Sequence, residues 1–552
     1  MILEFTFKVA GGLGMFLLGM RQMSGGLQSI AGDSLRRIID LLTSNRIAAV
    51  CVGFVITGVI QSSSITSVMV VGFVNAGLMN LTQAIGVIMG ANIGTTITGW
   101  IIAIKVTKYA LPMIALGAFV FLFSKREKPQ LYGQVLYGLG MVFFGLHLMK
   151  DGFSPLRESE QIMVWLNHFG AGGLSSLMLT LAVGAGVCML IQSSSAFIGI
   201  VMAMSSTGLL DFETSVALVL AANIGTTITA QLAALGTNVH ARRAARAHMI
   251  FNVVGVLLTL LVFHRFIDIV DALVPNDPNL LAPDGTRPYV MTHLAMATTI
   301  FNVAFVLLFL PFVQYLAAFV AWALPDHGTQ EQHLIVVDER FLETPALALE
   351  QARREVIKMS GLVKEMLDKG RALFLMESGR TTAAREIFTM EVSVDEMQKE
   401  YSIFLARLLQ ASLTREESEE ARELIRISDE LESIGDFAEN LAKCYMRAKK
   451  NKTVFTTAAK ADIERIGRHI GEYFDLILEA FEGQDTTLMP EAKSRGETIN
   501  ALADEIRNNH LGRLDGGQCD ALSGLIFSDV VVSLRRIKNH TFNIAEAVAL
   551  QK

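Results

Sequence analysis

The sequence predicts an all-α protein that consists of a polytopic membrane half followed by a charged helical half. No charged residue occurs between Arg46 and Lys105, a run far longer than the roughly 20 residues that one membrane-spanning helix needs. Residues 1–324 carry 13 acidic and 17 basic side chains, which leaves 40 acidic and 30 basic ones for the remaining 228 residues. From about Gln330 the apolar residues recur with the period of an amphipathic helix. We therefore expect a membrane domain at 1–324, a linker at 325–344 and a helical domain at 345–552.

The membrane half contains an internal repeat. The motif QSSS occurs at residues 61–64 and again at residues 192–195, an offset of 131 residues. The motif NIGTTIT follows each copy, from Asn92 and from Asn223, with the same offset. Self-similarity in one register indicates a duplicated structural unit. We expect repeat 1 at about 8–124, repeat 2 at about 131–264 and a final membrane span at about 292–323.

Basic residues near the ends of the apolar segments predict the orientation of the chain, because Lys and Arg are enriched in cytoplasmic loops. When the clusters at 36–46, 125–128 and 242–246 are all placed inside, the two repeats cross the membrane in opposite directions. Inverted repeats with polar interruptions are typical of secondary transporters, whose substrate lies near the bilayer midplane between broken helices. The apolar runs 47–79 and 174–210 are too long for one crossing. We expect each to form a hairpin or a broken, re-entrant helix with QSSS at or near its tip.

The QSSS motif has a structural and a functional interpretation. Small hydroxyl residues let helices approach closely and bond across the interface, and a duplicated motif can be a duplicated structural device. Repetition in register with NIGTTIT favours a binding site. Hydroxyls and the N–H groups at helix starts donate to an oxyanion, whereas Gln, Asn and Thr oxygens and unwound carbonyls coordinate Na⁺. Neither motif contains a basic side chain, so a bound anion can leave readily, as a carrier requires.

Two QSSS motifs, each followed by NIGTT at the same spacing, resemble the type II sodium-phosphate cotransporters over about residues 8–320. The HMIFN run at 248–252 also resembles the His/Phe/Asn segment of that family. The resemblance implies Na⁺-coupled movement of inorganic phosphate by a protein that is not an enzyme and does not bind nucleic acid. It implies phosphate-binding residues Gln61, Ser62, Ser63, Ser64, Gln192, Ser193, Ser194 and Ser195. It implies sodium ligands Gln61, Asn92, Thr95, Thr96, Gln192, Ser193, Asn223, Thr226 and Thr227.

The C-terminal half has the pattern of a helical bundle. Its segment at 425–443 places four carboxylates along one helix face, because residues three and four apart are neighbours on a helix. From composition alone this face is equally a solvated acidic surface or a cation site. The four carboxylates are those of Asp429, Glu432, Asp436 and Glu439. We expect helix breaks around Thr344, Ser412, Asn451, Gly483 and Gly516.

The run LESIGD followed by NLAK resembles the PhoU domain, a phosphate-regulatory bundle of two three-helix repeats, over about residues 345–550. The resemblance implies a divalent metal ion at Glu432 and Asp436. The second half carries Arg535 and Asn539 at the corresponding positions, which argues against a second metal cluster there.

We therefore interpret the chain as a sodium-coupled inorganic phosphate symporter of the inner membrane, with Na⁺ as the coupling ion and a cytoplasmic PhoU-like domain. We expect a homodimer in the lipid bilayer, with a cytoplasmic regulatory partner for the C-terminal domain. One alternative is a membrane-anchored phosphate sensor. Another is a related carrier that exports phosphate or moves another oxyanion such as sulfate. The sequence contains no GxxxxGK[ST] loop that would supply ATP-driven transport.

Overall fold

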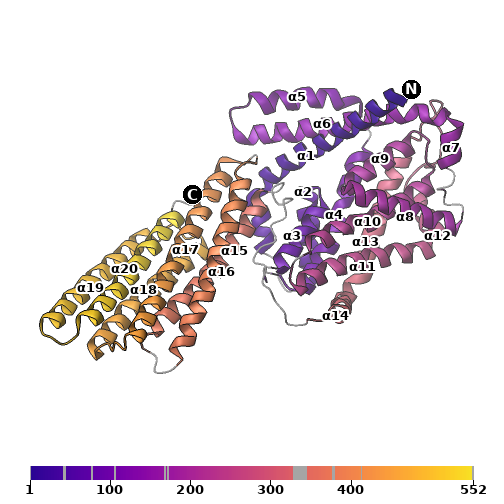
Figure 1. Cartoon of the computed structure of the whole chain (residues 1–552). Coiled ribbons are helices and arrows are strands. Elements are labelled where there is room, and N and C mark those ends of the chain that lie inside the picture. Colours follow the sequence, from indigo (N-terminus) through magenta and orange to yellow (C-terminus); the bar gives the residue numbers. More distant parts are fainter. Residues whose placement is uncertain are drawn as a thin grey trace. The chain divides into compact units, whose positions relative to one another are not determined.

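The chain is helical, as the sequence predicts, and it divides into two units, residues 1–346 and 347–552 (Figure 1). No β-strand occurs in the part of the chain that the computed structural model describes. This part comprises residues 2–40, 45–75, 77, 79–104, 107–166, 170, 173–235, 237–326, 345–375, 379–411 and 413–549.

The first unit is a bundle of apolar helices. Among the described residues, six helical segments are long and apolar enough to cross a membrane, which agrees with a polytopic membrane half: Leu81–Ala103, Glu127–Arg157, Leu174–Ile191, Phe212–Ala233, Val239–Leu261 and Val290–Ala323. The α-helices of the unit are α1 (Ile2–Asp40), α2 (Arg46–Ile60), α3 (Ser63–Asn75), α4 (Leu81–Ala103), α5 (Ala110–Phe123), α6 (Glu127–Phe153), α7 (Glu160–Leu166), α8 (Leu174–Ile191), α9 (Ser194–Ser206), α10 (Phe212–Ala233), α11 (Val239–Leu261), α12 (Phe263–Leu273), α13 (Val290–Phe309) and α14 (Val313–Ala323).

Both QSSS motifs interrupt a helix. Gln61 ends α2 with φ 57° and ψ 25°, and Gln192 ends α8 with φ 55° and ψ 19°, so both lie in the left-handed region. In repeat 1 the Thr66 Oγ1 lies 2.9 Å from the Oγ1 of Thr57, two residues that a continuous helix would hold about 13 Å apart along its axis. The chain therefore reverses direction at Gln61. This confirms the predicted hairpin for the first motif and the predicted break for the second.

Helices α3 and α9 each contain 13 residues. Such a helix is about 20 Å long, which is less than the roughly 30 Å of a hydrocarbon core. Each short helix packs against the longer helix that follows it, α3 against α4 and α9 against α10. At the first tip, Gln61 contacts Thr98, five residues before the last residue of α4.

Helices α1 and α6 run antiparallel along a seam of glycines (Figure 1). Gly12 faces the backbone of Gly145, and Gly19 faces the backbone of Gly138, so the two helices approach closely at both points. Glycine permits this contact because a side chain would fill the space that the partner backbone occupies. Helix α5 pairs with α6 on its other side.

The described part of the second unit contains six α-helices. Helices α16 and α17 pack together, α18 and α19 both pack against α20, and α17 packs against α20. The α-helices are α15 (Pro345–Ala372), α16 (Arg380–Leu408), α17 (Arg415–Lys450), α18 (Thr457–Gly483), α19 (Met489–Asp515) and α20 (Ala521–Ala549).

The predicted breaks of the C-terminal half agree with helix ends at Lys450, Gly483 and Asp515. The expected breaks at Thr344 and Ser412 fall on residues that the structure does not describe. The sequence prediction missed the break between α15 and α16. There Gly379 adopts φ 77° directly before α16, a conformation that glycine reaches without the penalty that a Cβ imposes.

We predict opposite effects for two glycines of α1. A Cβ at Gly19 would lie 2.6 Å from the Val142 nitrogen and 2.7 Å from the Gly138 oxygen, whereas a Cβ at Gly14 meets nothing within 4 Å. Gly19→Ala should destabilise the protein by about 1–3 kcal/mol through overpacking, and Gly14→Ala should be neutral or stabilising by up to about 1 kcal/mol. Thermal unfolding of both variants in detergent measures the difference. Equal melting temperatures would contradict the close α1–α6 contact.

Candidate functional site

The two QSSS motifs share one local structure. Ser62 Oγ accepts a hydrogen bond from the Ile65 N–H at 3.3 Å, and Ser193 Oγ accepts one from the Ala196 N–H at 3.3 Å. Each serine thus satisfies one of the open N–H groups at the start of α3 or α9. The hydroxyl proton of each serine is not used in that bond. Both helix starts therefore present hydroxyls and positively polarised backbone, which suits an anion.

The glutamine of the first motif is tied to the NIGTTIT helix of its own repeat. Gln61 is buried, its Oε1 accepts a hydrogen bond from Thr98 Oγ1 at 3.0 Å, and its Nε2 donates to the Gly58 carbonyl. Thr98 is the last residue of NIGTTIT, and its counterpart Thr229 donates to the Thr226 carbonyl at 2.8 Å. Sequence reasoning did not select Thr98 as a site residue. The only signal for it was its place inside the repeated motif.

The predicted sodium ligands outside the QSSS motifs lie on α4 and α10, where several bond back to their own helix. Thr95 Oγ1 donates to the Ala91 carbonyl at 3.1 Å, and its counterpart Thr226 donates to the Ala222 carbonyl at 2.7 Å. Such bonds occupy the hydroxyl proton and leave oxygen lone pairs for a cation. Thr227 bonds back in the same manner, and Thr96 is buried on α4.

Asn92 and Asn223 occupy the same position of the repeat, but they differ in partner. Asn92 Nδ2 donates to Asn252 Oδ1 on α11 at 2.9 Å, whereas Asn223 Nδ2 donates to the Val219 carbonyl of its own helix at 3.3 Å. Asn252 belongs to the HMIFN run.

The two repeats meet where α3 packs against α10 and where α4 packs against α9.

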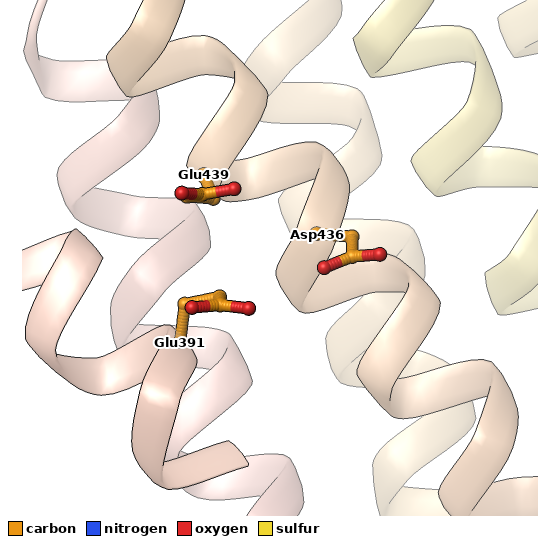
Figure 2. A group of neighbouring side chains, drawn as sticks. All are labelled: Glu391, Asp436 and Glu439. Carbon is orange, nitrogen blue, oxygen red and sulfur yellow. The ribbon is translucent and has the colours of Figure 1, made fainter. Parts of the chain in front are cut away.

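In the second unit, three carboxylates from two helices gather at one place (Figure 2). Glu391 of α16 and Asp436 and Glu439 of α17 each place an oxygen within 4.8 Å of the others. Burial is the main cause that raises the pKa of Glu391 and of Asp436, and the charge of Glu439 adds to it for both. Lys443 forms an ion pair with Glu439. The cluster offers the hard oxygen ligands that Mg²⁺, Mn²⁺ or Ca²⁺ prefers.

The membership of this cluster differs from the predicted pair. Asp436 belongs to it, but Glu432 does not, and Glu432 accepts a hydrogen bond from Ser433 Oγ at 3.3 Å. Burial, followed by the charge of Asp436, raises the pKa of Glu432. The sequence did not indicate Glu391, because no short-range spacing connects a residue of α16 to one of α17.

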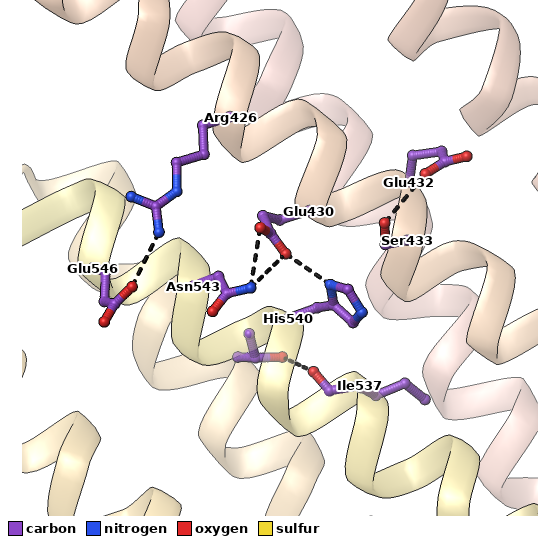
Figure 3. A network of polar contacts seen from close by, with 9 residues as sticks. Arg426, Glu430, Glu432, Ser433, Ile537, His540, Asn543 and Glu546 are labelled. Atoms are coloured by element: carbon purple, nitrogen blue, oxygen red, sulfur yellow. Dashed lines mark hydrogen bonds and ion pairs between the residues drawn. The ribbon is translucent and has the colours of Figure 1, made fainter.

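A separate polar network joins α17 to α20 (Figure 3). Glu430 accepts hydrogen bonds from His540 Nδ1 at 2.7 Å and from Asn543 Nδ2 at 3.1 Å, and Arg426 pairs with Glu546 at 3.0 Å. These contacts hold the two halves of the bundle together and leave the acidic cluster on a different side of α17.

The second half of the bundle carries a basic side chain where the first half carries Glu432. Arg535, at the position that corresponds to Glu432, pairs with Asp504 of α19 at 3.3 Å. A basic side chain at this point disfavours a divalent cation through charge repulsion.

Family comparisons match both units. The Na⁺/Pi-cotransporter family model matches residues 15–151 and 163–274. The PhoU domain model matches residues 356–444 and 462–548. The two families that the sequence motifs resemble are thus found in the order that was predicted.

Similar proteins include three with different coverage. YjbB of Salmonella typhimurium, which is named for inorganic phosphate export, is 23% identical over 503 residues, 91% of this chain and 89% of that protein. The uncharacterized protein YqeW of Bacillus subtilis is 32% identical over 296 residues, 54% of this chain and 91% of that protein. Sodium-dependent phosphate transport protein 2A of Ovis aries is 40% identical over 83 residues, 15% of this chain and 12% of that protein. The chain therefore belongs to the Na⁺/Pi-cotransporter family, as a membrane protein with a C-terminal PhoU domain.

Proposed function

We propose that this protein is a carrier that couples the movement of inorganic phosphate to Na⁺. One observation carries the proposal: Gln61 and Gln192, at equivalent positions of the repeat, both end a helix in the left-handed conformation. A serine-capped helix start follows each of them. Two helix starts without a basic side chain suit an anion that must be bound and then released. We assign phosphate to residues 61–64 and 192–195, and Na⁺ to these motifs and the NIGTT oxygens.

Charge balance explains why Na⁺ would accompany phosphate. Moving a divalent phosphate inward against an inside-negative potential of 100 mV costs about 4.6 kcal/mol, because each elementary charge costs about 2.3 kcal/mol. Two Na⁺ ions that move with the phosphate cancel its charge. They also add the sodium concentration gradient as a driving force.

We further infer that the two repeats have inverted topology in the inner membrane, with the PhoU domain in the cytoplasm. The runs GGLGMFLLGM and YGLGMVFFGL on α1 and α6 correspond at an offset of 126 residues. Under this correspondence Gly12 matches Gly138 and Gly19 matches Gly145. The antiparallel contacts of Gly12 with Gly145 and of Gly19 with Gly138 are those that a two-fold axis between equivalent helices produces. The homodimer and the regulatory partner remain predictions.

Export of phosphate is the second candidate function. The name of YjbB, which is similar to 91% of this chain, favours it. The same site geometry serves both directions, because a carrier moves its substrate down the combined gradient of substrate and coupling ion. Import and export differ in the gradients that the cell maintains and not in the residues that bind phosphate.

The PhoU domain offers a cation site at Glu391, Asp436 and Glu439. Their mutual repulsion is only partly offset by Lys443, so a divalent cation would relieve it. Bound there, the cation would cross-link α16 to α17. We propose that phosphate status or metal binding at this domain regulates transport.

Transport by reconstituted protein tests the carrier proposal. Labelled phosphate should accumulate in proteoliposomes under an inward Na⁺ gradient. Gln192→Asn should weaken phosphate binding by about 10- to 100-fold, because it retracts an amide that we assign to a charged ligand, while Asn still tolerates the left-handed backbone. Ser175→Ala, at an exposed position near the start of α8, is the control that should transport normally. Folded wild-type protein without gradient-driven flux in either direction would overturn the proposal.

Hydrogen exchange of the full-length protein tests the cation site. Since the folded state raises the pKa of Glu391 and Asp436, it binds protons more tightly than the unfolded state. Stability of α16 and α17 should therefore fall as the pH rises from about 4 through the raised pKa values. At pH 7, Mg²⁺ or Mn²⁺ should increase the protection of both helices.

Asp436→Asn should protect α16 and α17 at pH 7 without metal and should abolish the effect of the cation. Glu396→Gln changes an exposed carboxylate of the same α16 and serves as the control. Protection that is independent of both pH and cation in the wild type would contradict the site.

A further inference from the structure

A further duplicated motif places two asparagines deep in the membrane unit. The run IFNV occurs at residues 250–253 and again at 300–303. Its asparagines, Asn252 on α11 and Asn302 on α13, are each only 1% exposed. Asn252 Nδ2 donates to the His248 carbonyl at 3.0 Å, and Asn302 Nδ2 donates to the Thr298 carbonyl at 2.9 Å. This bond fixes the orientation of each amide, because the reversed amide would place two oxygens in contact.

The two asparagines differ at their oxygens. Asn252 Oδ1 accepts a hydrogen bond from Asn92 Nδ2 at 2.9 Å. Asn302 Oδ1 is buried and has no hydrogen-bond partner among the described residues. An amide oxygen that is removed from both water and hydrogen-bond donors is unfavourable inside a membrane protein. The Asn302 oxygen therefore needs an occupant other than the surrounding protein.

Contacts along α13 show which residues share the depth of Asn302. Gly99 of α4 faces Ala295 of α13 at van der Waals distance, and Val306 packs in one apolar cluster with Met89 further along α4. The two helices are thus antiparallel. Asn92 lies seven residues from Gly99, and Asn302 lies seven residues from Ala295. Because α4 and α13 are antiparallel and an α-helix rises by the same distance per residue, seven residues along each helix bring Asn92 and Asn302 to the same depth along the helix axes.

The second repeat reaches the same level. Phe212 of α10 contacts His293 of α13, and their ring centroids are 5.6 Å apart. Asn223 lies 11 residues after Phe212, and Asn302 lies 9 residues after His293, so the two asparagines lie at a similar distance from this contact. Gln231 of α10 donates to the Ala245 carbonyl of α11 at 2.6 Å. Asn223 lies 8 residues before Gln231, and Asn252 lies 7 residues after Ala245, so these two asparagines also lie at a similar distance from the contact between α10 and α11. We use the name asparagine layer for these four residues, Asn92, Asn223, Asn252 and Asn302.

We propose that Asn302 Oδ1 is a ligand of a Na⁺ ion that binds in the asparagine layer together with Asn223. The proposal rests on the sodium coupling proposed above and adds a residue from outside the two repeats. A neutral amide oxygen is a suitable ligand for Na⁺, and it holds the ion without the strong charge pairing that would slow its release. Asn252 cannot serve in the same manner, because its oxygen already accepts the Asn92 amide. Asn92 and Asn252 bond to each other, whereas Asn223 and Asn302 each donate to their own helix. We therefore assign the ion to the side-chain oxygens of Asn223 and Asn302.

Trp100 supplies a binding signal that does not depend on transport. Its Nε1 donates to Thr299 Oγ1 at 2.9 Å, and Thr299 lies about one helical turn from Asn302. The chain contains three tryptophans, so Trp165→Phe and Trp322→Phe leave Trp100 as the sole reporter. Purified full-length protein is titrated with NaCl at constant ionic strength, with choline chloride as the replacement salt. The Na⁺ dependence of phosphate uptake by proteoliposomes is measured for the same variants as a second readout.

Asn302→Ala should raise the Na⁺ concentration for half-maximal response by about tenfold or more, as expected for the loss of one ligand to a charged species. At saturating Na⁺ the half-saturating phosphate concentration should stay within about twofold of the wild type. Asn302→Asp keeps an oxygen at this position and should retain the Na⁺ response. Thr259→Val replaces a buried hydroxyl of the neighbouring α11 and is the control for a general packing defect.

If Asn302→Ala keeps the Na⁺ dependence of the wild type in both readouts, the proposal is overturned. The Asn302 oxygen would then accept a hydrogen bond from a water molecule or from the Asn223 amide. An equal shift in Thr259→Val would also overturn it, because the effect would then come from packing. Wild-type protein whose phosphate flux does not depend on Na⁺ would instead refute the sodium coupling itself, and with it this ligand.

Discussion

The membrane unit depends on how a helix can be interrupted inside a bilayer. Each helix end exposes backbone groups that hydrocarbon cannot satisfy. At Gln61 and Gln192 the chain meets this requirement locally. The left-handed glutamine donates its own N–H to the last turn of the first helix, to Thr57 or Cys188, and the next residue caps the following helix with its hydroxyl. The interruption therefore needs no charged side chain.

Close helix packing surrounds these tips. Gly53 and Gly90 bring α2 and α4 together, and Gly184 and Gly225 bring α8 and α10 together. Gly184 and Gly53 differ by the repeat offset of 131 residues, so the same contact supports both tips. Where helices pack this tightly, side-chain amides and hydroxyls can meet their partners directly. Among the four asparagines, Asn92 bonds to Asn252, whereas the Asn302 oxygen has no hydrogen-bond partner among the described residues.

The PhoU domain shows how two halves of one bundle diverge. In the first half, Glu391, Asp436 and Glu439 concentrate negative charge between α16 and α17. In the second half, Arg535 faces Asp504 and the charges neutralise each other. We propose that the first half responds to a cation, whereas the second half forms an ion pair instead. The network around Glu430 joins α17 of the first half to α20 of the second.

The sequence by itself determined the helical class, the membrane half, the duplicated motifs, the helix breaks at Gln61 and Gln192 and the PhoU resemblance. These features are local or periodic, so the residue order along one segment contains them. The tertiary structure decided which distant residues meet. It placed Thr98 on Gln61, brought Glu391 together with Asp436 and Glu439, and left the Asn302 oxygen without a hydrogen-bond partner among the described residues. No sequence spacing predicts such contacts, because they depend on how separate helices cross and on which side chains their packing leaves unpaired.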